Sequence, residues 1–251
     1  MNPIRITAVS YYNTLPFIYG LTHSGVLKDF TLSLDVPSEC ARKLIDHEAD
    51  IGLIPVGALP CIPKYDFVSN HCIGAISDVK SVLLLSDSEL SSIKTIYLDT
   101  DSRTSVNLVR VLAEKFWHIA PGWKCITELH GNLATDEAKV LIGDKTFGLS
   151  TQFNFCYDLA AEWIKFTSLP FVFAVWVTNT FIPEEFKLQL EKALSWGVSH
   201  RSECSIVGIN LKISENELVE YLQNNISFEL DDDKKKGLNL FLSYLKELKL
   251  D

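Results

Sequence analysis

The chain has 251 residues, of which 47% are apolar and 22% charged, and its formal net charge at pH 7 is −9. This composition is typical of a folded globular protein and excludes wholesale disorder. The negative charge argues against a general nucleic-acid binder, because such a protein needs a basic surface to neutralise phosphates. It also means that an anionic ligand has to be held by local dipoles rather than by the overall field.

The chain begins Met1-Asn2-Pro3-Ile4-Arg5-Ile6, with no basic region, apolar core or cleavage site of a secretory signal, so we expect a cytoplasmic protein. The longest apolar runs, such as 169–177, are about half as long as a membrane span. The six cysteines form no C-x-x-C pair and the histidines no H-E-x-x-H motif. Walker and G-x-G-x-x-G loops are also missing, so we expect no metal and no cofactor.

Short apolar runs alternate with helical patterns, which is typical of βαβ units and mainly parallel sheets. In chain order the pattern predicts strands at 4–9, 32–36, 50–54, 73–75, 81–85, 95–98, 140–144 and 170–177. It predicts helices that start at 15–17, at Ser38 and at Ser105, and further helices at 158–166, 183–200, 215–224 and 235–249.

Two apolar strands, 81–85 and 171–176, are interpreted as crossings between two α/β lobes. On this hypothesis residues 1–84 and 174–251 form one lobe, and residues 85–173 form the other. The predicted fold class is therefore α/β, with a ligand cleft between two lobes where the carboxyl ends of strands meet.

Four polar segments directly follow predicted strands, which places them at this cleft. They are Ser10-Tyr11-Tyr12-Asn13-Thr14, Ile54-Pro55-Val56-Gly57, Asp99-Thr100-Asp101-Ser102-Arg103-Thr104-Ser105 and Gly143-Asp144-Lys145. In the third segment, hydroxyl groups and unpaired N–H groups at a helix start form an anion site that needs no net positive charge.

Each candidate in these segments also has a purely structural interpretation. Ser102 or Thr104 is suited to capping the helix. Arg103 either pairs with a ligand carboxylate or bridges to the neighbouring aspartates. Asn13 and Asp144 are also common turn residues.

The same segments resemble the chorismate dehydratases of the futalosine route to menaquinone. The resemblance is collinear from residue 4 to about residue 200. It is carried by Val9–Pro16 (VSYYNTLP), Asp50–Val56 (DIGLIPV), Ser81–Ser86 (SVLLLS), Leu98–Arg110 (LDTDSRTSVNLVR), Leu141–Asp144 (LIGD), Tyr157–Leu159 with Trp163, and Thr167–Trp176 (TSLPFVFAVW). Ser168 departs from the usual glycine of the family, and Asp78 lies where a small or apolar residue is expected.

The resemblance implies a type II periplasmic-binding-protein fold and a lyase that dehydrates chorismate, a small dianion, to 3-[(1-carboxyvinyl)oxy]benzoate. Asn13, Ser81 and Asp144 are the implied catalytic residues. Asn13 would lie against the reacting ring or its leaving hydroxyl, and Ser81 would contact the substrate from a crossing. Asp144 would be a hydrogen-bond partner or proton acceptor, although the substrate's own enolpyruvyl carboxylate is an alternative base.

The implied carboxylate site consists of Thr104, Ser105 and their N–H groups. The other expected substrate contacts are Tyr11, Thr14, Ile54, Pro55, Ser102 and Arg103. Two alternatives stay open, a non-catalytic solute-binding protein and the sister enzyme dihydroxynaphthoate synthase. The first loop of that synthase is Ser-Pro-Cys-Pro-Asn-Asp-like, whereas Ser10–Pro16 matches the dehydratases.

Overall fold

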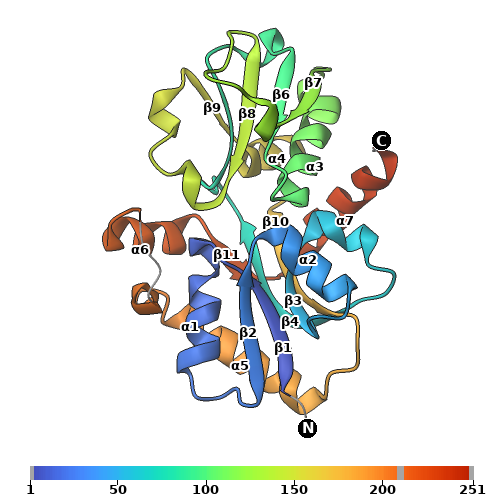
Figure 1. The fold of residues 1–251 in the computed structure, drawn as a ribbon, viewed down its shortest axis with the longest axis vertical. Helices are drawn as coiled ribbons and strands as arrows, with labels where there is room; N and C mark the ends of the chain where they lie inside the picture. The colour runs from blue at the N-terminus through green and yellow to red at the C-terminus, as the bar shows by residue number, and fades with distance from the viewer. Residues whose placement is uncertain (1–2, 208–211, 249–251) are drawn as a thin grey trace.

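The computed structural model describes residues 3–207 and 212–248, which form two β-sheets with helices packed around them (Figure 1). The first sheet, in the lower half of Figure 1, has the strand order β11-β4-β10-β3-β1-β2. Its strands are β1 (Ile4–Val9), β2 (Phe30–Asp35), β3 (Ile51–Pro55), β4 (Asp66–Ala75), β10 (Phe171–Thr178) and β11 (Ser227–Glu229).

The second sheet, in the upper half, has the strand order β7-β6-β8-β5-β9. Its strands are β5 (Val82–Ser86), β6 (Thr95–Leu98), β7 (Gly122–Cys125), β8 (Glu137–Ile142) and β9 (Phe155–Asp158). The α-helices around both sheets are α1 (Leu15–His23), α2 (Pro37–Ile45), α3 (Arg103–Leu112), α4 (Leu159–Thr167), α5 (Glu184–Ser199), α6 (Glu215–Asn224) and α7 (Asp232–Glu247).

The α/β class is confirmed, but both sheets are mixed rather than mainly parallel. Strand β1 pairs in parallel with β2 and β3, as βαβ units require. Strand β10 runs antiparallel to β3 and β4, because it brings the chain back from the second sheet in the opposite direction. In the second sheet β5, which enters from the first, is antiparallel to both of its neighbours for the same reason.

The chain leaves the first sheet after Ala75, enters the second at Val82, and is back in the first at Phe171. The two segments predicted as crossings are the strands β5 and β10, and each of them pairs with strands of one sheet only. The predicted lobe boundaries at residues 84 and 174 fall inside β5 and β10 rather than in the links before them. As boundaries of folding units they stay a prediction.

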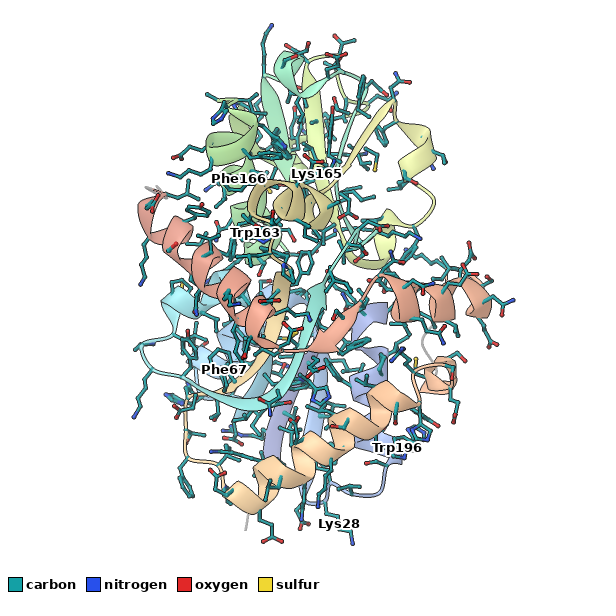
Figure 2. The ribbon with its side chains drawn as sticks, turned by 180° about the vertical axis from the view of Figure 1, so that it is seen from behind. Lys28, Phe67, Trp163, Lys165, Phe166 and Trp196 are labelled. Carbon is teal, nitrogen blue, oxygen red and sulfur yellow. The ribbon has the colours of Figure 1, made fainter. Side chains whose placement is uncertain are left out.

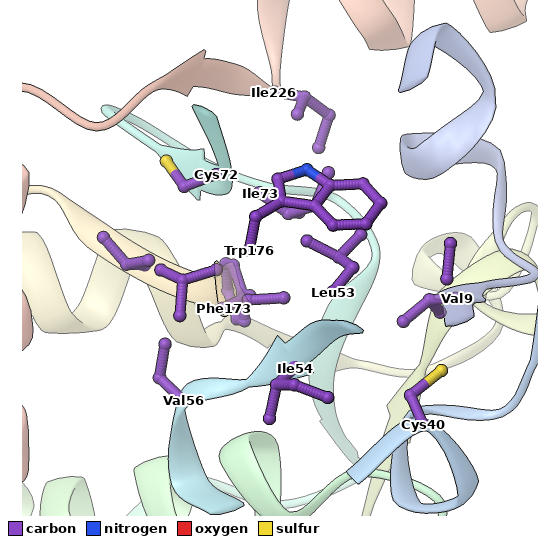
Figure 3. Close-up of a cluster of buried hydrophobic side chains, with 14 of the residues drawn as sticks. Val9, Cys40, Leu53, Ile54, Val56, Cys72, Ile73, Phe173, Trp176 and Ile226 are labelled. Atoms are coloured by element: carbon purple, nitrogen blue, oxygen red, sulfur yellow. The ribbon is translucent and has the colours of Figure 1, made fainter. Parts of the chain in front are cut away.

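The core of the first sheet is continuous with the segments that follow its strands. Leu53, Ile54 and Trp176 are fully buried and lie in one cluster with Val56 and Phe173 (Figure 3). Every residue of β3 and β10 is buried, which explains their unbroken apolar sequences. This packing fixes the loops at the carboxyl end of β3.

The C-terminal helix α7 contacts elements on both sides of the junction. It packs on β10 of the first sheet, and its Phe241 and Tyr244 also contact Trp163 and Phe166 of α4. Figure 2 shows Trp163 and Phe166 beside this helix. The ring centroids of Trp163 and Phe241 are 5.9 Å apart. Aromatic burial of this size contributes strongly to stability, so α7 holds α4 against the first sheet.

Candidate active site

A pocket lies where the two sheets meet. Among the described residues that line it there is no charged side chain. The lining comprises Val9, Tyr11, Asn13, Thr14, Pro37, Pro55, Ile73, Val79, Ser81, Val82, Ser102, Thr104, Ser105, Ile142, Gly143, Phe173 and Ala174. Hydroxyl and amide groups on an apolar surface between the two sheets make it the candidate active site.

The loop between β1 and α1 forms one wall and includes the short helix η1 (Tyr12–Thr14). The Asn13 Oδ1 atom accepts a hydrogen bond from the Thr14 hydroxyl at 3.2 Å, so the amide NH₂ group is directed elsewhere. Burial, together with nearby aspartates, raises the pKa of Tyr11, and its phenol is therefore neutral.

The amino end of α3 forms the opposite wall. Ser102 is the N-cap, and its Oγ atom accepts a hydrogen bond from the Ser105 N–H at 3.2 Å. The Ser102 hydroxyl lies 3.1 Å from Ser105 Oγ, so both hydroxyls face the same end of the pocket. The first N–H groups of a helix have no partner inside it, and they carry its positive dipole end.

Thr104 joins this helix to the first sheet. Its hydroxyl donates to the carbonyl oxygen of Phe173 at 3.1 Å and accepts from the N–H of Gly57 at 3.0 Å. Because both functions of the hydroxyl are used, the predicted carboxylate contact of Thr104 rests on its backbone N–H. The side chain instead fixes α3 relative to β10.

Ser81 lies between the two sheets, directly before β5, and is buried. Its backbone carbonyl accepts from the Gly143 N–H at 2.8 Å, which ties the loop after β8 to the crossing. Its Oγ atom accepts a hydrogen bond at 2.8 Å from the hydroxyl of Tyr221 on α6. No sequence motif points to Tyr221, which lies 140 residues after Ser81 in the chain.

Asp144 lies just behind the pocket lining, in the short helix η6 (Gly143–Thr146). Its Oδ1 atom accepts a hydrogen bond from the Tyr12 N–H at 2.9 Å, which connects the second sheet to the first loop. Burial raises the pKa of this carboxyl to about 6. Near neutral pH it can exchange a proton, as a catalytic acid or base must.

One lysine pairs with both neighbouring acids. Lys145 forms ion pairs with the buried Asp99 and, at 3.6 Å, with Asp101. These contacts join the loops after β6 and β8. The mixed charges explain how an acidic segment can lie next to the hydroxyl-rich wall without leaving an unpaired buried charge.

Most of the predicted site residues meet in this pocket. Those that line it are Tyr11, Asn13, Thr14, Pro55, Ser81, Ser102, Thr104 and Ser105. Three do not line it. Ile54 is fully buried in the core of the first sheet, Asp144 lies behind the lining, and Arg103 is exposed on the outer side of α3, donating to Cys61 Sγ at 3.5 Å.

A comparison with protein families matches residues 4–247 to a family described as menaquinone biosynthesis. The chain belongs to this family. One curated relative is the chorismate dehydratase of Thermus thermophilus, which is 25% identical, with 98% of this chain and 96% of the relative covered. This family member is accordingly an enzyme of menaquinone biosynthesis with a small-molecule substrate.

Solved structures similar to this menaquinone-biosynthesis protein show its fold. A protein of Archaeoglobus fulgidus aligns with a TM-score of 0.76 at 13% identity, over 98% of this chain and 97% of that one. A Candida albicans protein with the generic periplasmic-binding-protein fold aligns with a TM-score of 0.63 at 11% identity, over 100% and 92%. The predicted periplasmic-binding-protein-like fold is thereby confirmed. None of the helices in 3–207 and 212–248 is long and apolar enough to cross a membrane.

Proposed function

We propose that this protein dehydrates chorismate to 3-[(1-carboxyvinyl)oxy]benzoate. The observation that carries the proposal is the pocket between the sheets, which offers hydroxyl, amide and helix N–H groups but no charged side chain among the described residues. Family membership and the similarity to a chorismate dehydratase support the same reaction. A cytoplasmic location stays a prediction from the sequence.

The reaction needs little chemistry from the protein. The C–H bond at the ring carbon that bears the enolpyruvyl ether breaks, and its electron pair becomes part of the aromatic ring. The C–O bond to the ring hydroxyl breaks at the same time, and the proton and hydroxide leave as water. The ring carboxylate withdraws electrons from the breaking C–H bond, so the site has to orient the dianion and stabilise its developing charge.

The amino end of α3 is suited to one of the two carboxylates. Ser102 and Ser105 bring two hydroxyls to the pocket, and the helix dipole adds partial positive charge. Asn13 and Ser81 lie on the other parts of the lining, where they would contact the reacting ring and its hydroxyl.

We assign the role of base to the enolpyruvyl carboxylate of the substrate. The ionisable lining side chain, Tyr11, is held neutral because burial raises its pKa. Asp144 has a suitable pKa of about 6, but its carboxyl accepts from the Tyr12 N–H behind the lining. The intramolecular carboxylate is already adjacent to the ether carbon, which provides a high effective concentration.

The test is to incubate the purified protein with chorismate and follow the ultraviolet spectrum, with mass spectrometry to detect the loss of one water. Conversion supports the proposal. Binding without conversion would identify a solute-binding protein, and indifference to chorismate would favour the sister synthase. Asn13→Ala and Ser81→Ala are each expected to lower the turnover of chorismate. Full turnover in both variants would show that the assignment of the site residues is wrong.

A further inference from the structure

Tyr221 is a buried tyrosine whose hydroxyl reaches the candidate active site from a distant part of the chain. It is 3% exposed and lies in α6, which begins at a capping box of Ser214 and Glu217. The Phe147 ring packs edge-on against it, with centroids 5.0 Å apart at 90°. The ring is thus held by packing, and the hydroxyl position is fixed with it.

The Tyr221 hydroxyl lies between two residues that line the pocket. It donates to Ser81 Oγ at 2.8 Å. The Asn13 side chain also lies near the phenol, and Asn13 and Ser81 both act to lower the pKa of Tyr221 against the effect of burial.

The direction of the Tyr221–Ser81 hydrogen bond determines where the proton of Ser81 points. Ser81 Oγ receives the Tyr221 proton, so its own proton has to be directed to another acceptor. No side chain or carbonyl in the described part of the chain accepts it, and Ser81 lines the pocket. Successive hydrogen bonds of this kind polarise one another, which strengthens the last donor.

We propose that Tyr221 is a positioning residue that directs the Ser81 hydroxyl toward the leaving hydroxyl of the substrate. The inference rests on the proposed dehydration of chorismate. The Ser81 O–H group then donates to the oxygen whose C–O bond breaks, where negative charge develops. Tyr221 itself does not touch the substrate, since it is absent from the described lining.

The protonation of Tyr221 agrees with this role. Burial raises its pKa, and the nearby carboxyls of Asp144 and Asp158 act in the same direction. The phenol therefore remains a donor throughout the neutral range, and a phenolate, which could only accept, is avoided. The Ser81 proton would otherwise turn back toward Tyr221 and away from the pocket.

The decisive variant is Tyr221→Phe, which keeps the ring against Phe147 and removes only the hydroxyl. We expect kcat for chorismate to fall about tenfold or more, because a hydrogen bond is lost mainly in the transition state. KM should change less than about threefold, since the carboxylate site at α3 is untouched. The melting temperature measures any loss of structure separately.

A double-mutant cycle distinguishes positioning from a general structural effect. If Tyr221 acts through Ser81, the double variant Y221F/S81A should have the same kcat as S81A alone. The matched control is Tyr97→Phe, which removes another buried hydroxyl, a donor to Glu137 at 2.9 Å on β6, outside the pocket lining. Y97F is expected to keep the wild-type kcat.

The outcomes separate this inference from the proposed function. If the wild type converts chorismate but Y221F has the wild-type kcat, or its loss adds to that of S81A, the positioning role is overturned and the proposed function stands. An equal loss in Y97F would also overturn it. If the wild type does not convert chorismate, the proposed function fails, and the role of Tyr221 fails with it.

Discussion

Asp144 is an acid whose buried surroundings favour its protonated, uncharged form. Burial raises its pKa from 3.8 to about 6, despite the hydrogen bond from the Tyr12 N–H, which lowers it. Since the folded state binds more protons than the unfolded state between these values, stability falls as pH rises from about 4 to about 6. Above about 6, the full cost of the buried charge is present.

Asp144→Asn is expected to remove this pH dependence while keeping an oxygen that accepts from Tyr12. Relative to the wild type, the variant should gain free energy of unfolding as pH rises from about 4 to 6, and the gain should level off at about 2–3 kcal/mol. Urea titrations across this range measure it. Asp87→Asn is the control, because Asp87 is exposed and also accepts from a backbone N–H, that of Asn154. A difference that is constant with pH would contradict the prediction.

The same residue scale shows what a sequence can indicate about a site. The positions of Ser102 and Ser105 in the pocket were predictable, because they are hydroxyl residues at a helix start that directly follows a strand. Ile54 and Arg103 lie in segments of the same kind, but their side chains point away from the pocket, Ile54 into the core and Arg103 to the outer side of α3. Packing decides this direction, and a local motif does not show it. Tyr221 has no local motif, and only the folded chain brings it to Ser81.

Among the elements, α3 has the most direct connection between local sequence and function. Its N-cap, Ser102, accepts from the Ser105 N–H and also lines the pocket. Ser102→Ala is expected to cost about 1 kcal/mol of stability because the cap is lost. It should also weaken chorismate binding, because the Ser105 hydroxyl loses the hydrogen bond from Ser102 that orients it in the pocket. Calorimetric titration and thermal unfolding measure the two effects.

Ser102→Thr is the matched variant, because it keeps the capping oxygen and should retain most of the stability. The prediction for Ser102 is wrong if the alanine variant binds chorismate as tightly as the wild type. Loss of stability without loss of binding would mean that the hydroxyl only caps the helix.

The elements that sequence patterns missed are short edge strands. Strands β7, β9 and β11 have only 4, 4 and 3 residues, and they lack the mostly buried apolar run that marks the equally short β6. Their pairing partners lie far away in sequence, so their extended form depends on the finished sheet. The fully buried strands β3 and β10 were predictable because they form nearly continuous apolar runs.

For the whole molecule, Thr104 provides the hydrogen bonds that join α3 to the first sheet. Thr104→Val has nearly the same shape but leaves the Gly57 N–H and the Phe173 carbonyl without their partner. We expect a loss of about 2–3 kcal/mol in the free energy of unfolding, measured with urea. Thr104→Ser retains the hydroxyl and should lose less. Equal stability of the valine variant and the wild type would contradict this role.

Gly57 sets how closely the second sheet's helix approaches the first sheet. A Cβ atom at this position would lie 2.8 Å from the carbonyl carbon and oxygen of Arg103 and from the Thr104 Cα atom. These are backbone atoms, so relief requires α3 to move away from η2 (Val56–Cys61), and Ser102 and Ser105 must move with it. A shift of this kind changes the width of the pocket between the sheets.

Gly57→Ala is therefore expected to lower kcat/KM for chorismate by about tenfold or more, since small displacements of positioning groups are costly. The melting temperature should fall as well, because the Thr104 hydrogen bond to residue 57 is strained. Gly122→Ala is the control, as its added Cβ would lie 3.6 Å from the Lys94 carbonyl oxygen, an ordinary contact on β7. If G57A and G122A have equal kcat/KM, the distance between α3 and the first sheet does not control the site.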